Sequence, residues 1–349
     1  GTPIEEVQRE YGLEDVIKLA SNENPLGPSP AAVEAIREAA SGLNLYPDGE
    51  SYYLRRALAD FVDVAPEQVA VGNGADGLIM QTCMAYVDEG SEVIVSASSF
   101  PVYDIYTHVM RGELIKTPLR NYGLDLEAMA DAVTPETRVI FVCNPNNPTG
   151  TIVTAHEVGA FMDRVPEHAL VVFDEAYYEM VDAEDYPETL PYVREGRPNV
   201  MIMRTFSKVF GLAGVRLGYA VAPVEVLAPI RRVKEPFAVN LLAQAAGVAA
   251  LEDTAFLRKT VEAAQRERAF LFEQLEAMGL HVIPSQTNFM LVEIGPDACQ
   301  VQEELVKRGV IVRPCTGYDL PEFLRVTVGT REQNERLLAA LTEIAASEG

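Results

Sequence analysis

The sequence predicts an α/β protein with a large doubly wound, mostly parallel sheet domain, a smaller α+β C-terminal domain and an N-terminal arm. From residue 68 onward, short and nearly continuous apolar runs alternate with helical patterns. Uninterrupted apolar runs are typical of strands that are buried on both faces of a parallel sheet. Their alternation with helices indicates βαβ units, from which doubly wound sheets are built.

The first 25 residues are expected to form the arm, which ends in the segment KLASNENPLGPSP. Its proline and asparagine clusters favour turns and cannot continue a helix. Ser29 followed by Pro30 then predicts the start of a helix, with serine as the cap and proline as the first helical residue. After the turn LYPDGE, the stretch SYYLRRALADFV has the pattern of an amphipathic helix.

Seven apolar runs are the predicted strands of the large domain: QVAVG, EVIVS, LIKTPL, VIFVC, LVVFD, VMIMR and GYAVA. A long helix is predicted from about Leu241 to Met278, and a smaller α+β pattern closes the chain. We therefore expect a large domain at residues 26–255 and a small domain at residues 256–349, with the boundary inside the long helix.

The composition argues against several classes of protein. The hydrophobic content of 48% is ample for a packed core, and the net charge of −24 argues against nucleic acid or anionic membranes as partners. The sequence contains no run of eighteen apolar residues that would predict a membrane span. The four cysteines and four histidines show no ligand spacing. We therefore expect no disulfide framework and no metal, and a reducing cytoplasm fits best.

Ligands of open α/β sheets bind outside the carboxyl ends of the strands, so the residues after each apolar run are candidates for a site. GNGADG follows QVAVG and leads into a helix, whose N-terminal amides can hold an anion. Phe100 follows EVIVS, NPNNPTG follows VIFVC, and Asp174 stands at the end of LVVFD. The glycine spacing matches a dinucleotide fingerprint, but serines stand where its acidic residue is expected, which disfavours a nicotinamide-dependent enzyme.

The segment RTFSKVFGLAGVRLGY brings an amine, hydroxyl groups and a cation together after the strand VMIMR. A lysine such as Lys208 forms a Schiff base when its environment keeps it partly neutral. Ser207 and Arg216 can hold a phosphate, the arginine through its planar fork. Asp174 at a strand end can keep a pyridine nitrogen protonated, as a pyridoxal ring requires. Each residue alone has an ordinary structural explanation, but together they favour a site for a phosphorylated carbonyl cofactor.

With NPNNPTG, FDEAY, TFSKVFGLAGVRLGY and LRVTVGTRE in this order, the sequence resembles the fold-type I pyridoxal-phosphate aminotransferases. Within them it is similar to the histidinol-phosphate aminotransferase family, from about Pro3 to Leu341, and KLASNENPLGPSP and LYPDG point to that subfamily. The resemblance implies pyridoxal 5′-phosphate as cofactor. It also implies transamination of L-histidinol phosphate with 2-oxoglutarate in histidine biosynthesis, giving imidazole acetol phosphate and glutamate.

The resemblance also implies roles for individual residues. Lys208 is expected to be the Schiff-base lysine, and Asp174 the partner of the pyridine nitrogen. Asn147 and Tyr177 are expected to contact the phenolate oxygen of the cofactor, and Phe100 to stack on its ring. Lys208, Asp174 and Tyr177 are the expected catalytic residues. The implied seat for the cofactor phosphate comprises Ala75, Asp76, Thr205, Ser207 and Arg216.

For the substrate, the resemblance assigns the carboxylate to Arg325 and the phosphate to Arg313 and Arg336, with Asn22 and Asn147 bordering it. Tyr46 matches a tyrosine that reaches the cofactor phosphate of the neighbouring subunit, which implies a homodimer with shared active sites. The sequence departs from the family in two places. Gly77 stands where relatives often have glutamate, and the upstream tyrosine segment that covers the substrate in relatives is not in this sequence, so the substrate lid is not predicted.

Three alternative functions stay open for the same residues. An aromatic-amino-acid aminotransferase is the nearest, and a threonine-phosphate decarboxylase on the same scaffold is the second. A non-catalytic regulator that binds pyridoxal phosphate is the third, and the sequence shows no DNA-binding appendage that would favour it.

Overall fold

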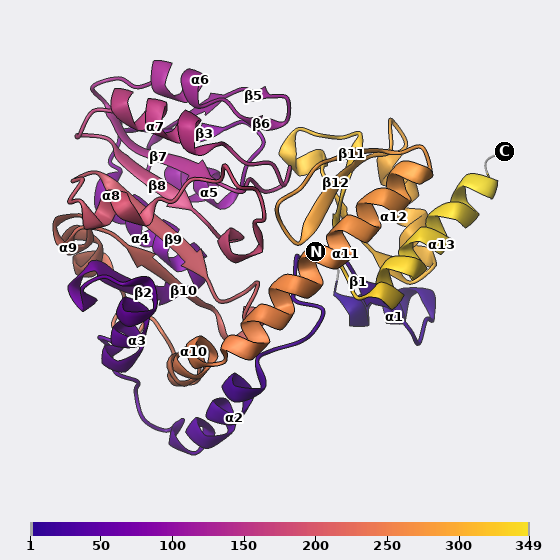
Figure 1. Ribbon diagram of the computed structural model, residues 1–349, viewed down its shortest axis with the longest axis horizontal. Helices are drawn as coiled ribbons and strands as arrows, with labels where there is room; N and C mark the ends of the chain where they lie inside the picture. Colours follow the sequence, from indigo (N-terminus) through magenta and orange to yellow (C-terminus); the bar gives the residue numbers. More distant parts are fainter. Residues whose placement is uncertain (1–2, 348–349) are drawn as a thin grey trace.

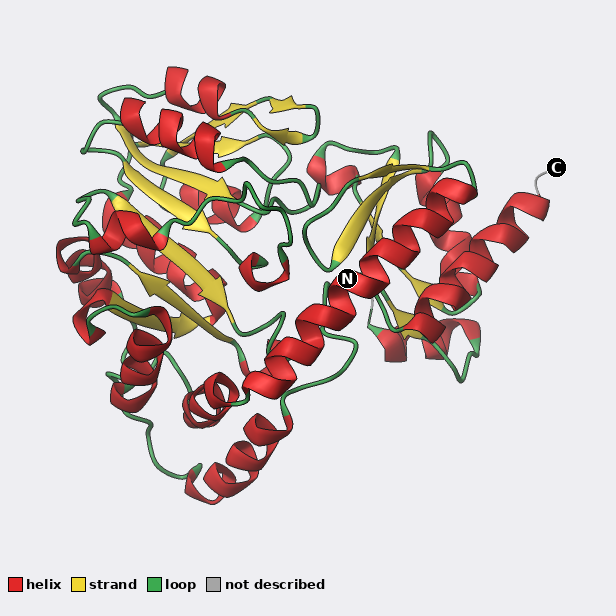
Figure 2. Cartoon of the chain, in the orientation of Figure 1, coloured by secondary structure: helices red, strands yellow, loops and turns green. Residues whose placement is uncertain are grey.

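The computed structural model describes residues 3–347 and contains two units, each built around its own sheet (Figures 1 and 2). The first two residues of the predicted arm and the last two of the predicted small domain lie outside the described residues. Within residues 3–347, no helix is long and apolar enough to cross a membrane.

The larger unit holds a seven-stranded sheet with the strand order β2-β10-β9-β8-β7-β3-β4. Its strands are β2 (Val69–Asn73), β3 (Glu92–Ser96), β4 (Glu113–Thr117), β7 (Thr137–Cys143), β8 (Leu170–Asp174), β9 (Val200–Thr205) and β10 (Leu217–Val221). All neighbouring strands are parallel except β10, which is antiparallel to both β2 and β9. Every one of these strands coincides with a predicted apolar run, so the predicted mostly parallel sheet is confirmed.

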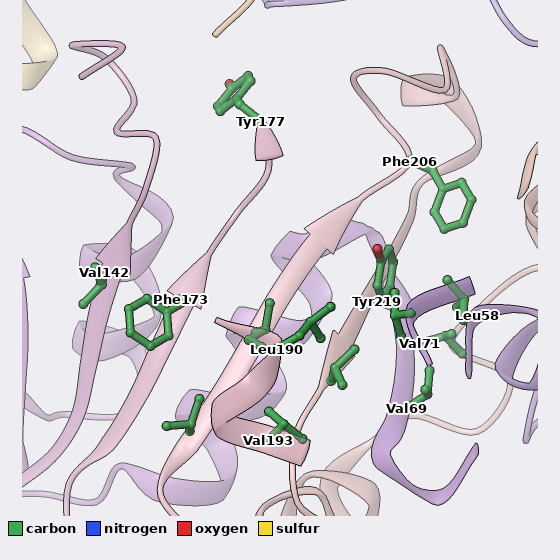
Figure 3. Packing of buried hydrophobic residues seen from close by; sticks show 14 of the residues in the cluster. Leu58, Val69, Val71, Val142, Phe173, Tyr177, Leu190, Val193, Phe206 and Tyr219 are labelled. Atoms are coloured by element: carbon green, nitrogen blue, oxygen red, sulfur yellow. The ribbon is translucent and has the colours of Figure 1, made fainter. Parts of the chain in front are cut away.

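Helices cover both faces of this sheet because alternate residues of each buried strand point to opposite sides. On one face the packed helices are α3 (Tyr52–Val62), α6 (Leu126–Asp131), α7 (Ala155–Arg164), α8 (Leu190–Arg194) and α10 (Leu241–Glu252). The other face packs against α4 (Gly74–Tyr86), α5 (Val102–Val109) and α9 (Val224–Val233). Figure 3 shows part of the first core, where Val142 and Phe173 are paired on neighbouring strands. The fold is therefore doubly wound.

The smaller unit is an antiparallel sheet with the order β11-β12-β15-β14. Its strands are β11 (His281–Ile283), β12 (Phe289–Glu293), β14 (Arg313–Pro314) and β15 (Phe323–Thr327). Its apolar core includes residues of α11 (Thr254–Ala277), α12 (Ala298–Lys307) and α13 (Arg331–Ser347). The remaining short elements are β5 (Leu119–Arg120), β6 (Gly123–Leu124) and 3₁₀ turns at Ala40–Gly42, Pro66–Gln68, Tyr178–Met180, Ala213–Val215 and Thr316–Tyr318.

The N-terminal segment packs against the smaller unit before it enters the larger one. It contains α1 (Ile4–Tyr11) and β1 (Ile17–Lys18), which pairs in parallel with β13 (Val310–Ile311). The chain then reaches α2 (Pro30–Ala39), which begins as predicted, with the Ser29 hydroxyl accepting the Ala32 amide at 3.3 Å.

The prediction of one helix from Leu241 to Met278 is wrong at one point, because the chain breaks between α10 and α11 at Asp253. The Asp253 carboxylate accepts the amide of Phe256 at 3.1 Å and the hydroxyl of Ser29 at 2.7 Å. A carboxylate held in this way caps a new helix and disfavours continuation of the old one. Helix α11 then runs from beside α10 into the smaller unit (Figure 1), and the domain boundary near residue 255 stays a prediction.

Candidate active site

A cavity of about 410 Å³ lies between the carboxyl ends of the large sheet, the N-terminal segment and the smaller unit. All residues predicted to bind cofactor or substrate line it, except Tyr46 and Arg336. Those lining residues are Asn22, Ala75, Asp76, Phe100, Asn147, Asp174, Tyr177, Thr205, Ser207, Lys208, Arg216, Arg313 and Arg325. The structure therefore brings together side chains that are up to about three hundred residues apart in the sequence, and their individual roles stay predictions.

The start of α4 forms one wall of the cavity. The residue before this helix is Asn73, whose side chain makes no capping hydrogen bond within the described residues. The amides of the first turn are therefore available to an anion. Gly74 has φ +73°, and a Cβ there would lie 2.5 Å from the Arg216 Nη2 atom. A Cβ at Gly218 would lie 2.5 Å from the backbone nitrogen of Ala75. Glycine is therefore needed at Gly218, where the neighbour is backbone, and any other residue at Gly74 would have to displace the guanidinium.

Arg216 faces this helix start from the turn before β10. Its Nη2 atom lies 3.2 Å from the Asp76 carboxylate, and its Nη1 atom donates to the Ser207 hydroxyl at 3.4 Å. The Thr205 hydroxyl accepts the Ser207 amide at 3.1 Å. A guanidinium, hydroxyls and helix amides therefore converge on one end of the cavity, which is the donor set that a phosphate requires.

Asp174 is buried at the end of β8, where it lines the cavity. Its Oδ2 atom accepts the Tyr103 hydroxyl at 2.6 Å, and its Oδ1 atom accepts the Ala176 amide at 3.2 Å. Burial raises the pKa of this carboxyl to about 6, although both hydrogen bonds act in the opposite direction.

Lys208 extends into the cavity from the turn after β9. Its Nζ atom donates to the Ser21 carbonyl at 3.3 Å and lies 5.6 Å from the centre of the Tyr177 ring. Burial, and then the positive charge of Arg325, lower the pKa of the Lys208 amine to about 8. The Tyr177 hydroxyl accepts the Asn22 side-chain amide at 3.0 Å. The amine therefore has a substantial neutral population near physiological pH.

Two arginines approach the cavity from the smaller unit. Arg313 on β14 and Arg325 on β15 are direct register partners, so their side chains leave the same face of the sheet. Arg325 donates to the Asn147 side chain at 2.5 Å and to the Ala20 carbonyl at 2.7 Å. Its buried Nε atom has no hydrogen-bond partner among the described residues. An unpaired buried donor beside two positive charges fits an anionic substrate group.

Arg336 and Tyr46 are not brought into this cavity. Arg336 lies on α13, where it binds the Asp15 carboxylate at 2.6 Å and the Asp15 carbonyl at 2.7 Å. Its guanidinium therefore binds the segment before β1 to the smaller unit, and its predicted contact with substrate phosphate stays a prediction. Tyr46 is 83% exposed and stacks on Phe237 with ring centres 4.6 Å apart.

Sequence reasoning missed several residues of the site. Tyr103 had a readable signal, because it follows the ring-stacking candidate Phe100 by three residues, close to one helical turn. Tyr318 lines the cavity and accepts from Arg325 at 3.2 Å, and nothing in the local sequence marks it. The Thr327 hydroxyl accepts the backbone amide of Asn22, and the side-chain amide of Asn288 donates to the Asn22 carbonyl.

The residues present fit the predicted cofactor. The cavity is lined by a candidate phosphate seat at Arg216, Ser207 and the start of α4, by the buried carboxyl of Asp174, and by the partly neutral amine of Lys208. These are the three groups that pyridoxal phosphate requires for its phosphate, its ring nitrogen and its aldehyde. Within residues 3–347, no cluster of three or more histidine, cysteine or acidic side chains is arranged to hold a metal ion.

Comparison with known proteins agrees with this arrangement. A histidinol-phosphate aminotransferase from Moorella thermoacetica is 51% identical over 346 residues, covering 99% of this chain and 90% of that protein. The corresponding enzyme from an Anaeromyxobacter species is 48% identical over 346 residues, covering 99% of this chain and 95% of that protein.

Solved structures show the same fold. The crystal structure of histidinol-phosphate aminotransferase from Sinorhizobium meliloti in complex with pyridoxal-5′-phosphate has a TM-score of 0.92 and 30% identity, covering 100% of this chain and 96% of that chain. A Thermus thermophilus aspartate aminotransferase variant has a TM-score of 0.86 and 28% identity, covering 97% of this chain and 93% of that chain. The family model for aminotransferase class I and II matches residues 14–341. The chain belongs to the class I and II aminotransferase family.

Proposed function

We propose that this chain transfers the amino group of L-histidinol phosphate to 2-oxoglutarate with pyridoxal 5′-phosphate as cofactor. The products are imidazole acetol phosphate and glutamate, and the reaction is a step of histidine biosynthesis. Relatives named histidinol-phosphate aminotransferase, at 51% and 48% identity over nearly the whole chain, support this assignment.

The observation that carries the proposal is the pair of arginines on β14 and β15. Histidinol phosphate has a phosphate and no carboxylate, whereas glutamate has two carboxylates, so one pocket must accept different anions at the same place. Arg313 and Arg325 are register partners at the cavity wall, and Arg325 keeps a buried donor atom without a partner among the described residues. The planar fork of a guanidinium can donate two parallel hydrogen bonds to a carboxylate or to a phosphate.

The cofactor would be held by groups from four strand ends. Arg216, Ser207, Thr205 and the first turn of α4 would take its phosphate, and Asp174 would pair with its ring nitrogen. When bound, pyridoxal phosphate supplies an aldehyde that condenses with amines and a ring that accepts an electron pair from the substrate carbon. Tyr177 and Asn147 line the same cavity, and their side chains would donate to the ring oxygen.

Lys208 is the proton carrier of the reaction. Its Nζ atom is partly neutral because burial and the charge of Arg325 lower its pKa to about 8. The neutral amine would accept the proton from the donor carbon that bears the amino group, and the charged amine would deliver it within the same half-reaction to the cofactor carbon that carried the aldehyde. The half-reaction with the acceptor would run the same two transfers in reverse. Asp174 in its anionic form favours a protonated ring nitrogen, and its burial strengthens that pairing.

We also propose a cytoplasmic homodimer in which Tyr46 reaches the neighbouring active site. The turn between α2 and α3 supports this, because it exposes apolar side chains that a monomer would leave in water. In this turn Leu43, Leu45 and Tyr46 are 60%, 68% and 83% exposed, and Tyr53 in the first turn of α3 is 78% exposed. All four cysteines are free, which fits a reducing compartment.

The proposal is tested by mixing the cofactor-loaded protein with single amino donors in the absence of an acceptor. We expect histidinol phosphate to abolish the visible absorbance of the cofactor at a lower concentration than phenylalanine or threonine phosphate does. Faster conversion by phenylalanine would make the protein an aromatic aminotransferase, and release of carbon dioxide from threonine phosphate would make it a decarboxylase.

A second experiment adds 2-oxoglutarate as acceptor and compares turnover by the native protein with turnover by Lys208→Ala. Because no other amine replaces Nζ in the proton transfer, we expect this variant to lose turnover by at least about a thousandfold. Repeated turnovers by Lys208→Ala at a rate near that of the native protein would contradict the proposed role of the lysine. A native protein that shows no visible absorbance band after addition of pyridoxal phosphate would contradict the proposed function itself.

A further inference from the structure

Tyr103 makes a buried hydrogen bond with the carboxylate that is proposed to hold the cofactor ring. Its hydroxyl lies 2.6 Å from Oδ2 of Asp174, and 71 residues of sequence separate the two side chains. Tyr103 is fully buried and Asp174 is 3% exposed, so water does not compete for this bond. A short bond from a hydroxyl to a carboxylate in a dry environment is about twice as strong as a neutral one.

The ring of Tyr103 is fixed by aromatic neighbours. It stacks on Phe141 of β7 with ring centres 4.4 Å apart and an interplanar angle of 10°. Its edge meets Phe100, the residue predicted to stack on the cofactor, with ring centres 5.7 Å apart. Tyr103 lies in the first turn of α5, which packs against the α4 face of the sheet (Figure 1). The hydroxyl therefore has a fixed position relative to both cofactor-facing residues.

Two neighbouring carboxylates oppose the negative charge of Asp174. Asp76 on α4 and Glu175 at the next position raise the pKa of Asp174, after the larger effect of burial. Cys143 on β7 lies nearby, and burial raises the pKa of its thiol to about 12, so it stays neutral. Burial and the Asp174 charge raise the pKa of Tyr103 well above its usual value, so the phenol keeps its proton and remains a donor.

We propose that Tyr103 is a positioning residue that keeps Asp174 ionised and holds its carboxylate toward the cofactor ring. Among the surrounding side chains, its hydroxyl is the group that donates to the aspartate, whereas Asp76 and Glu175 repel the charge. This inference rests on the proposed function, because the ion pair that Tyr103 supports requires bound pyridoxal phosphate. It concerns how tightly, and down to which pH, the protein holds its cofactor.

The test is the dissociation constant of pyridoxal phosphate from the apoprotein, measured by equilibrium dialysis between pH 5 and pH 8. In the native protein, affinity falls as the pH drops through about 6, because the Asp174 carboxyl becomes neutral. Tyr103→Phe removes a donor to the anion and so raises the pKa of Asp174. We expect its midpoint to move upward by about one pH unit, so that its affinity is about threefold lower at pH 6.5 and close to tenfold lower at pH 5.

Tyr86→Phe is the matched control, because the Tyr86 hydroxyl donates at 2.8 Å to the Val226 carbonyl, remote from Asp174 in the hydrogen-bond network. We expect its pH profile to overlay that of the native protein. In an Asp174→Asn background, Tyr103→Phe should no longer move the midpoint. Coincident profiles for Tyr103→Phe and the native protein, or equal shifts for both tyrosine variants, would overturn the inference. Failure of the native protein to bind pyridoxal phosphate would instead overturn the proposed function.

Discussion

At the scale of single residues, the site depends on two ionisable side chains whose pKa values differ from their ordinary values. Burial lowers the pKa of Lys208 to about 8 and raises that of Asp174 to about 6. Both shifts have the same physical cause, because a low dielectric disfavours the charged form of any group. Near neutral pH the amine of Lys208 is therefore partly neutral and can exchange protons, while the carboxyl of Asp174 is still mostly anionic because its raised pKa stays below 7.

The charges around Lys208 lead to a prediction with opposite signs for two variants. The neutral amine reacts with the cofactor, so incorporation of pyridoxal phosphate into the apoprotein should accelerate as the pH rises through about 8. Arg325 lowers the pKa of Lys208 and Glu23 raises it. Arg325→Gln should therefore move the midpoint to higher pH, and Glu23→Gln should move it to lower pH, each by at most about one unit.

The measurement for this prediction is the rate of appearance of the visible cofactor band after mixing, followed by stopped flow at each pH. This readout does not depend on amino donor or acceptor, so loss of substrate binding in Arg325→Gln does not disturb it. Shifts in the same direction for both variants would show that general loosening of the cavity, and not the charge, governs the lysine.

At the scale of elements, the start of α4 is a part of the fold where close packing requires glycine. The helix begins at a glycine with positive φ, and its first turn lies against Arg216 and against the backbone of β10 at Gly218. A helix N-terminus can hold an anion only if its amides are not covered by a side chain. Gly74 and Gly218 therefore allow the start of α4 to lie close to Arg216 and β10, and this brings the guanidinium next to the free helix amides.

We expect Gly74→Ala to weaken binding of pyridoxal phosphate by about tenfold or more, because the new Cβ would displace the Arg216 guanidinium, a charge-assisted donor. It should also lower the free energy of unfolding by about 1 kcal/mol, since alanine is strained at φ +73°. Equilibrium dialysis and urea denaturation measure the two effects.

Gly77→Ala is the matched control for Gly74→Ala. A Cβ at Gly77 would meet Asn73 at an ordinary contact distance of 3.5 Å, and the position is helical. This variant should keep cofactor affinity and gain up to about 1 kcal/mol of stability, because alanine favours the helix interior over glycine. Equal loss of affinity in both variants would contradict the role given to the Arg216 contact.

At the scale of the whole molecule, the proposed homodimer makes a prediction about mixed subunits. Tyr46→Phe keeps the ring that stacks on Phe237 and removes the hydroxyl proposed to reach the neighbouring site. Alone, this variant should lose about tenfold in activity at limiting cofactor, because one hydrogen bond to a charged phosphate is missing. After reassociation with excess Lys208→Ala subunits, each Tyr46→Phe subunit should recover most of that activity, since its site then receives a native Tyr46.

The control is the native protein reassociated with the same excess of Lys208→Ala, whose activity per native subunit should not change. Activity after mixing is followed together with sedimentation velocity, which reports the dimer directly. No recovery for Tyr46→Phe in mixed dimers would mean that Tyr46 acts within its own subunit or on stability alone.

The strands of the large sheet and the residues at their carboxyl ends could be predicted from the sequence for a physical reason. Strands buried on both faces must be apolar throughout, so the seven runs of the large sheet stand out, and neighbouring parallel strands place their carboxyl ends at one edge. Asp174 ends one such run and Lys208 follows another by four residues, so both were expected at the same edge of the sheet, and both line the cavity. The cap at Ser29 and Pro30 was readable in the same way, because it depends on hydrogen bonds within four residues.

Tertiary packing alone decided the features that depend on contacts between distant segments. Tyr103 meets Asp174 because α5 packs on the α4 face of the sheet, with the Tyr103 ring against Phe141 of β7. Arg336 is bound by Asp15, 321 residues earlier, and does not line the cavity. The break between α10 and α11 is stabilised by a bond from Ser29 to Asp253. Local patterns of apolar and polar residues report which face of an element is buried, but they carry no information about which distant side chain will lie against it, and that choice is made when the elements pack.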